Sequence, residues 1–195
     1  MSRLKRYSTC HNEPDWQYPG ALQQQFAPQA LLPWLLDPTS LTARLRHVCD
    51  GQFSVRLLEQ FWGRPQPGEA QLTDLKPGER ALIRQVHLCC DGRPLVFART
   101  VIPRSTLIGR CARLARLGTR PLGEVLFSDP SMRRSQLQIA RILKGNAVHA
   151  EALAENAPQH RQIWGRRSVF HLNQRPLLVS EIFLPQMPAF PWELA

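Results

Sequence analysis

The chain has 195 residues, which suits a single domain with a sizeable hydrophobic core. Hydrophobic residues make up 43% of it and charged residues 21%, proportions that are typical of a soluble globular protein. The net charge of +10 permits an anionic partner, but the arginines stand singly or in pairs, and no motif of the common nucleic-acid-binding modules is visible. We therefore expect no nucleic-acid partner and favour a small anionic metabolite, which positive potential steers into a cleft.

Cysteine usage and hydropathy exclude further classes of protein. The five cysteines are odd in number and contain no CxxC spacing, so they predict neither a disulfide framework nor a zinc site. They are Cys10, Cys49, Cys89, Cys90 and Cys111. The first residues lack the apolar stretch of a signal peptide, and no apolar run reaches the ~18 residues that a membrane span needs. We expect a cytoplasmic protein with no membrane span.

The N-terminal part is predicted to be a loose extension followed by short helices. Residues 1–20 are polar and contain two prolines, which indicates a flexible extension, and residues 21–195 are predicted to form one domain. Apolar residues over 22–36 favour helix, although two prolines break it into short pieces. Turn and N-cap residues at 37–40 precede a helix start at Leu41.

A strand over residues 52–62 and a proline- and glycine-rich loop over 63–78 lead to the first predicted hairpin. Its arms are 80–90 and 95–103, joined through Asp91-Gly92, a strong signal for a tight turn.

Two arginines of this hairpin occupy core-facing strand positions. Arg84 shares its face with Leu82, Val86 and Leu88, because side chains alternate across a strand. Arg99 likewise lies in an apolar row of the second arm, and an arginine so placed needs a partner. For Arg99 we favour an ion pair with a strand neighbour over a role in guiding an anion.

Two helix starts offer backbone N–H groups to a ligand. A basic helix over 105–116 is followed by a second helix start at 119–124, with Thr119 as the capping residue. The N–H groups near Leu122 are then free to hold an anion, and Leu41 occupies the same position in the earlier helix.

The segment before the last hairpin gives weaker signals. Residues 136–142 favour strand over helix, and the alanine-rich, polar stretch 146–162 predicts a surface helix that we interpret as an insert. His149 and His160 lie too far from other candidate ligands to predict a metal site, so we favour solvated positions for both.

The last hairpin contains a carboxylate in an apolar strand. Its arms are Ser168–Leu172 and Pro176–Leu184, joined by the polar residues 173–175. Glu181 lies in a strand that is apolar on both faces, where an unpaired carboxylate costs several kcal/mol, roughly. Either Glu181 forms a buried ion pair, with Arg84 as the candidate partner, or both charges face a shared cavity that holds a ligand.

Four ordered blocks of the sequence resemble the chorismate pyruvate-lyase family. They are WLLDPTSLTARLR, LCCDGRPLVFARTVIPRSTL, LGTRPLGEVLF and WGRRSVFHLNQRPLLVSEIFLP, and they lie between about residues 31 and 185. Matched position by position, the ligand contacts of the family fall on Leu41, Arg84, Leu122 and Glu181. The N-terminal extension and the 146–162 stretch depart from the family pattern.

The resemblance implies an α+β fold in which a single antiparallel sheet carries helices on one side. Two helical-hairpin flaps, at 33–46 and 105–127, would cover a buried ligand site. All four contacts would bind chorismate, and Arg84 and Glu181 would also be catalytic, without a metal or cofactor. The products would be pyruvate and 4-hydroxybenzoate, made in the first committed step of ubiquinone biosynthesis. We expect a monomer, and closed flaps imply product inhibition.

Two other functions remain as alternatives. One is a non-catalytic module that binds a small anion, similar to the effector domains of transcription regulators. The other is a nucleic-acid-binding protein, which only the net charge of +10 supports. The presence of both Arg84 and Glu181, and the lack of a DNA-binding segment before residue 31, favour the enzyme over the binding module.

Overall fold

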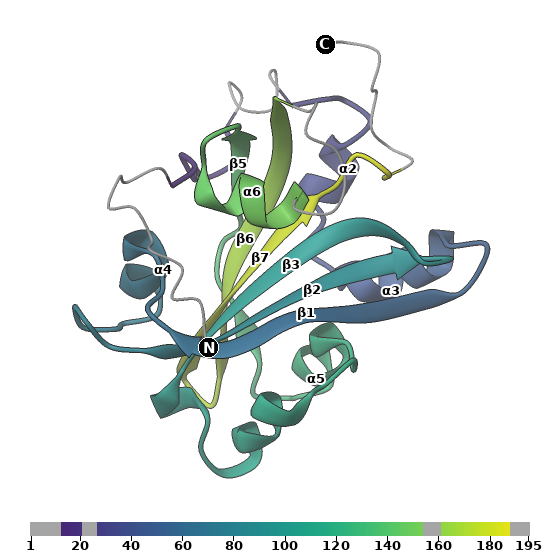
Figure 1. Cartoon of the computed structure of the whole chain (residues 1–195). Coiled ribbons are helices and arrows are strands. Elements are labelled where there is room, and N and C mark those ends of the chain that lie inside the picture. Colours follow the sequence, from purple (N-terminus) through teal and green to yellow (C-terminus); the bar gives the residue numbers. More distant parts are fainter. Residues whose placement is uncertain (1–12, 21–26, 154–160, 188–195) are drawn as a thin grey trace, which may run out of the picture.

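Seven antiparallel strands form one sheet (Figure 1). The computed structural model describes residues 13–20, 27–153 and 161–187. Within them the strand order is β1-β2-β3-β7-β6-β4, and β5 also pairs with β6. The strands are β1 (Phe53–Gly63), β2 (Ala81–Cys90), β3 (Arg93–Pro103), β4 (Arg133–Arg134), β5 (Gln138–Leu143), β6 (Gln162–Leu172) and β7 (Arg175–Phe183). The predicted antiparallel sheet is confirmed.

Both predicted hairpins are present and lie side by side. Asp91 and Gly92 join β2 to β3, and Asn173 and Gln174 join β6 to β7, all four with positive φ. Two-residue turns of this kind match the right-handed twist of the flanking strands. The hairpins pair through β3 and β7, so the centre of the sheet is built from residues that are far apart in the sequence.

Helices cover both faces of the sheet. One face carries α2 (Leu32–Leu35), α3 (Leu41–Val48), η1 (Arg104–Thr106), η2 (Gly109–Arg116) and α5 (Leu122–Phe127); the other carries α4 (Pro67–Leu72) and α6 (Ala147–Leu153). The expectation of helices on one side only is wrong. Since both alternating rows of β2 and β3 are buried, each face of the sheet needs its own cover. None of the helices in the described ranges is long and apolar enough to cross a membrane.

The rear face, defined as the face opposite Arg84, holds a buried ion pair. Arg99 donates from Nε to Glu69 Oε1 at 2.7 Å and from Nη2 to Glu69 Oε2 at 3.1 Å. Glu69 belongs to α4, which lies inside the segment 63–78 that was predicted to be loop. Its carboxylate also accepts from Gln66 N at 2.9 Å, so it caps this short helix as well. The structural ion pair favoured for Arg99 is therefore present, but its partner belongs to a helix and not to a neighbouring strand.

Part of the 146–162 stretch, which was expected at the surface, packs on the rear face of the sheet. In α6, Val148, Ala152 and Leu153 are buried in the core, and His149 is 7% exposed, so its predicted solvated position is wrong. The apolar residues of α6 recur on one side of the helix, and this side needs cover. Residues 154–160 of this stretch, including His160, lie outside the described residues.

Part of the predicted flexible extension is held against the sheet. Gln17 forms an antiparallel bridge with Ile139 of β5, and Glu13 accepts a hydrogen bond from Gly68 N at 3.0 Å. Residues 1–12 lie outside the described ranges.

Cys49 and Cys90 form a disulfide, with Cα atoms 5.8 Å apart. The expectation of no disulfide is therefore wrong. These cysteines are 41 residues apart in sequence, and they meet because Phe53 at the start of β1 pairs with Cys90 at the end of β2. The bond fixes the C-terminal end of α3 to the sheet.

Replacing Cys49 by serine is expected to lower the free energy of unfolding by ~2–4 kcal/mol, because the bond no longer restricts the unfolded chain. Chemical denaturation of the oxidised wild type and of Cys49→Ser measures the difference. A reductant should destabilise the wild type to the same level and leave the variant unchanged. Equal stability of oxidised wild type and variant would contradict the assignment.

Candidate active site

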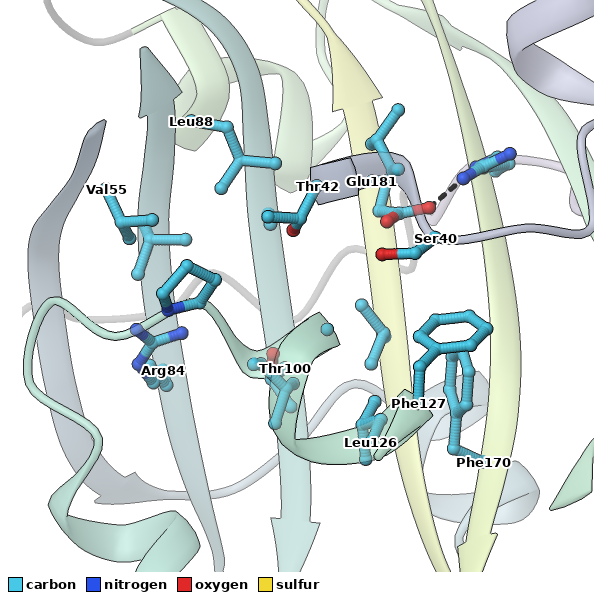
Figure 2. A pocket seen from close by; sticks show the side chains of 18 of the residues that line it. Ser40, Thr42, Val55, Arg84, Leu88, Thr100, Leu126, Phe127, Phe170 and Glu181 are labelled. Atoms are coloured by element: carbon cyan, nitrogen blue, oxygen red, sulfur yellow. Dashed lines mark hydrogen bonds and ion pairs between the residues drawn. The ribbon is translucent and has the colours of Figure 1, made fainter. Parts of the chain in front are cut away.

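A cavity lies between the sheet and the first residues of α3 and α5 (Figure 2). Its empty space, including the open mouth, is about 540 Å³. Leu41, Arg84, Leu122 and Glu181, the four residues singled out from the sequence, all line this cavity. Arg84 and Glu181 lie on opposite sides of it, with Thr100 between them in the view.

Arg84 is a buried cation with one hydrogen-bond donor, Nε, that has no partner among the described residues. It lies in β2 opposite Thr100 of β3 and is 2% exposed. Its Nη2 donates to the backbone oxygens of Gly118 at 2.9 Å and Arg120 at 3.1 Å. Its Nε is buried and has no partner among the described residues, and burial lowers the pKa of the guanidinium to about 10. An anion bound in the cavity would stabilise the charged form of Arg84 and offset the cost of its burial.

Glu181 is paired with Arg166 and not with Arg84. Arg166 Nε donates to Glu181 Oε2 at 2.6 Å, and the other carboxylate oxygen, Oε1, lies outside this ion pair. Arg166 Nη1 donates to the backbone oxygens of Trp34 at 2.7 Å and Asp37 at 2.6 Å. The candidate ion pair between Arg84 and Glu181 is therefore wrong, and both charges instead face a shared cavity, as the other alternative expected.

Arg166 was missed because the register of the last hairpin depends on the length of its turn. A three-residue turn over 173–175 would place Arg167 opposite Glu181. The observed turn has two residues, and it pairs Arg166 with Glu181 instead. A shift of one residue turns every side chain to the other face, so the turn length decides which arginine enters the cavity.

Arg134 is the second residue missed from the sequence. It lies in the two-residue strand β4, a segment with no periodic signal, and lines the same cavity. Its Nη1 donates to Pro38 O at 2.6 Å, its Nε donates to Ser168 Oγ at 3.1 Å, and its guanidinium lies 5.1 Å from the Phe170 ring centre. Burial lowers the pKa of the Arg134 guanidinium.

The first residues of two helices border the cavity. Ser40 caps α3 and accepts a hydrogen bond from Ala43 N at 3.4 Å, as predicted. Pro121, not Thr119, occupies the N-cap of α5, which begins at Leu122. The first N–H groups of a helix have no partner within it, so Leu41 and Leu122 both bring free backbone donors to this region.

The two helices meet above the sheet at Gly123. A Cβ atom at this position would lie 3.2 Å from Thr42 Oγ1 and 3.3 Å from Ser40 Oγ. Arg46 of α3 and Glu124 of α5 form an exposed ion pair beside this contact. The absence of a side chain at Gly123 therefore permits close packing of α3 and α5.

The lining combines positive charge with apolar walls. Its charged residues are Arg84, Arg134, Arg166 and Glu181, three cations and one anion, which leaves an excess of two positive charges. Aliphatic and aromatic side chains make most of the remaining wall, among them Val55, Leu88, Ala98, Leu126 and Phe170. In the described residues, no three His, Cys, Asp or Glu side chains gather where they could hold a metal ion. The arrangement suits a small organic ligand with two negative charges.

Comparison with known proteins identifies close relatives over most of the chain. A family model described as "Chorismate lyase" matches residues 11–190. A "Probable chorismate pyruvate-lyase" of Azoarcus sp. (strain BH72) is 50% identical over 169 residues, which cover 85% of this chain and 89% of that protein. Proteins with the same description from Aromatoleum aromaticum and Methylococcus capsulatus are 45% and 42% identical, covering 84% and 81% of this chain and 89% and 96% of theirs.

Solved structures resemble this chain in fold alone. The PhnF C-terminal domain has a TM-score of 0.55 at 15% identity, covering 70% of this chain and 86% of that one. PhnF from Mycobacterium smegmatis has a TM-score of 0.55 at 13% identity, covering 77% of this chain and 65% of that one.

Proposed function

Since this chain belongs to the chorismate lyase family and is a lyase that acts on chorismate, we propose that it releases pyruvate and 4-hydroxybenzoate, the precursor that starts ubiquinone biosynthesis. The observation that carries this proposal is the placement of Arg84 and Glu181 on opposite sides of one cavity with apolar walls. Chorismate has two carboxylates, an enolpyruvyl ether and a neighbouring ring hydroxyl. The excess of two positive charges in the lining matches its charge.

The reaction depends mainly on the orientation of the bound chorismate and on the stabilisation of its negative charges. The ether bond between the ring and the enolpyruvyl oxygen breaks, and the hydrogen on the hydroxyl-bearing ring carbon leaves. The ring becomes aromatic, and the enolpyruvyl group takes up one proton to become pyruvate. Because aromatisation drives the elimination, oriented binding in a dry site supplies much of the acceleration, and no cofactor is required.

In the proposed complex Arg84 binds the ring carboxylate. Its Nε lacks a partner among the described residues, while Nη2 is held by two loop carbonyls, so the guanidinium is oriented before the ligand arrives. The backbone N–H groups at Leu41 and Leu122 add donors from the helix starts. Arg134, which burial has desolvated, is suited to the carboxylate of the enolpyruvyl group.

Glu181 is proposed to meet the ring hydroxyl on the other side of the cavity. Arg166 holds Oε2 and compensates the charge, and this leaves Oε1 for the ligand. Two routes then move the ring hydrogen. Glu181 accepts it as a general base, or it passes directly to the methylene carbon of the enolpyruvyl group and Glu181 only orients the ring.

We propose that residues 33–46 and 105–127 act as two flaps over the bound ligand. Support comes from α3 and α5, which belong to these segments, border the cavity and touch at Gly123. Ligand exchange then requires their separation. Product release is expected to be slow, and 4-hydroxybenzoate is expected to inhibit the enzyme.

Gly123→Ala is expected to weaken the binding of 4-hydroxybenzoate about fivefold, the equivalent of ~1 kcal/mol, and to raise steady-state turnover. The new methyl group contacts Thr42 and Ser40 and holds the two helices apart. Inhibition constants and burst kinetics give the measurement, and single-turnover rates serve as the control for unchanged chemistry. An unaltered inhibition constant would count against closure at this contact.

The direct test of the function is to mix the purified protein with chorismate, without added metal or cofactor, and to follow the products by chromatography. Equimolar 4-hydroxybenzoate and pyruvate are expected. Intact chorismate, with the protein shown to be folded, would overturn the proposal and leave a non-catalytic role in binding a small anion.

A further inference from the structure

A second concentration of positive charge lies outside the cavity, on the segment 104–123. This segment carries five arginines and no acidic residue: Arg104, Arg110, Arg113, Arg116 and Arg120. All five side chains are exposed. Figure 1 shows this part of the chain beside α5, at the end of the molecule away from α6.

The helix η2 sets three of these arginines in one row. A 3₁₀ helix has three residues per turn, so residues three apart lie above one another. Cys111 and Leu114 of η2 pack into the core, and Arg110, Arg113 and Arg116 are exposed. Burial of the apolar positions therefore fixes the cationic row on the outside of the protein.

The row borders a hollow that is distinct from the cavity described above. Arg110, Arg113, Arg116 and Arg120 line it, and the other lining residues, Gly109, Ala112, Leu117 and Val125, have no charge. One acid lies beside the row: Asp129 Oδ2 is 3.9 Å from Arg113 Nη2. Among the described residues, no carboxylate lines the hollow itself, so its four arginines outnumber the one neighbouring acid, Asp129.

The chemistry of this surface fits phosphate groups presented side by side. Guanidinium groups bind phosphate oxygens in a bidentate manner, and a row of them matches several headgroups better than one free ion. Ile108, at the start of η2, is 50% exposed and adds an apolar side chain beside the arginines. Cationic residues next to an exposed apolar one are typical of surfaces that adsorb to anionic lipid.

We propose that the arginine row of η2, with Arg120 and Ile108, docks the protein on an anionic phospholipid surface. The contact is peripheral and reversible, since the apolar side of η2 is already used in the core. The hollow and the cavity have no lining residue in common, so the proposed docking surface is separate from the proposed ligand contacts.

The test is co-sedimentation with vesicles of phosphatidylcholine, with and without phosphatidylglycerol. Wild-type protein is expected to bind the anionic vesicles only, and added salt should weaken the binding. The double variant R113E/R116E should lower the partition coefficient about tenfold or more. The matched control R93E/R141E makes the same change in net charge at two other exposed arginines, and it should retain most of the binding.

Several results would overturn the proposal. One is that the wild type does not bind the vesicles, and another is that both double variants lose vesicle binding equally. A third is that inorganic phosphate at matched ionic strength displaces the protein from the vesicles. The last is that the protein binds an oligonucleotide tightly but does not bind the vesicles. Chemical denaturation of R113E/R116E should give the same midpoint as that of R93E/R141E, which shows that the variant is folded. Failure of the wild type to act on chorismate would overturn the proposed function and leave the vesicle result valid.

Discussion

Arg84→Met is expected to lower kcat/KM for chorismate about 10³-fold, equivalent to ~4 kcal/mol, because the ring carboxylate loses its buried cationic partner. The same variant should make the ligand-free protein more stable by ~1–3 kcal/mol. The pKa of Arg84 is lowered to about 10, so the folded state disfavours the charged form relative to the unfolded chain. This penalty is present at neutral pH and declines only as the pH rises through about 10.

Chemical denaturation without ligand measures the change in stability. Steady-state kinetics with chorismate measure the change in kcat/KM, and calorimetry with 4-hydroxybenzoate measures product binding separately. The carbonyls of Gly118 and Arg120, which Arg84 now binds, belong to exposed residues, so water can replace the lost donors. Arg84→Lys is the control, since it keeps the charge but loses the planar fork, and it should bind product with intermediate affinity. If Arg84→Met bound the product as tightly as the wild type, the assignment of the carboxylate to Arg84 would fail.

Glu181→Gln is expected to lower kcat by about 10²–10⁴-fold if Glu181 removes the ring hydrogen, with little change in product binding. A decrease within about tenfold would indicate that the residue only orients the ring hydroxyl, because an amide can still form that hydrogen bond. Rapid-quench measurement of a single turnover isolates this step from product release. Glu79→Gln, a substitution of an exposed glutamate, is the matched control and should not change the rate.

Isotopic labelling separates the two routes independently of the variant. Chorismate with deuterium on the hydroxyl-bearing ring carbon will give pyruvate with deuterium in its methyl group if the transfer is direct. A general base exchanges the label with water, so the methyl group would then carry solvent hydrogen. Near-full turnover by Glu181→Gln, together with complete transfer of label, would exclude the role of base.

Local sequence patterns were sufficient to single out four residues that line one cavity. Strand alternation singled out Arg84 and Glu181, and capping residues located the helix start at Leu41. These features depend on neighbours within a few residues. The tight turn at Asp91-Gly92 likewise predicted the β2–β3 hairpin correctly.

The features that escaped prediction depend on contacts between distant segments. Arg166 enters the cavity only because the last turn has two residues, and Cys49 meets Cys90 only because β1 pairs with β2. The helix α4 is six residues long, begins at Pro67 and is stabilised by the contact of Glu69 with Arg99 of β3. None of these contacts follows from the periodicity of one segment.

The disulfide has a mechanical consequence for α3. Its C-terminal end is fixed at Cys49, while Leu41, at the other end, borders the cavity. With a rise of 1.5 Å per residue, the eight residues of α3 span about 12 Å, so a tilt of about 10° displaces the far end by about 2 Å. A rotation of α3 about the disulfide would therefore move Leu41, at the end of the helix beside the cavity, further than any other residue of the helix.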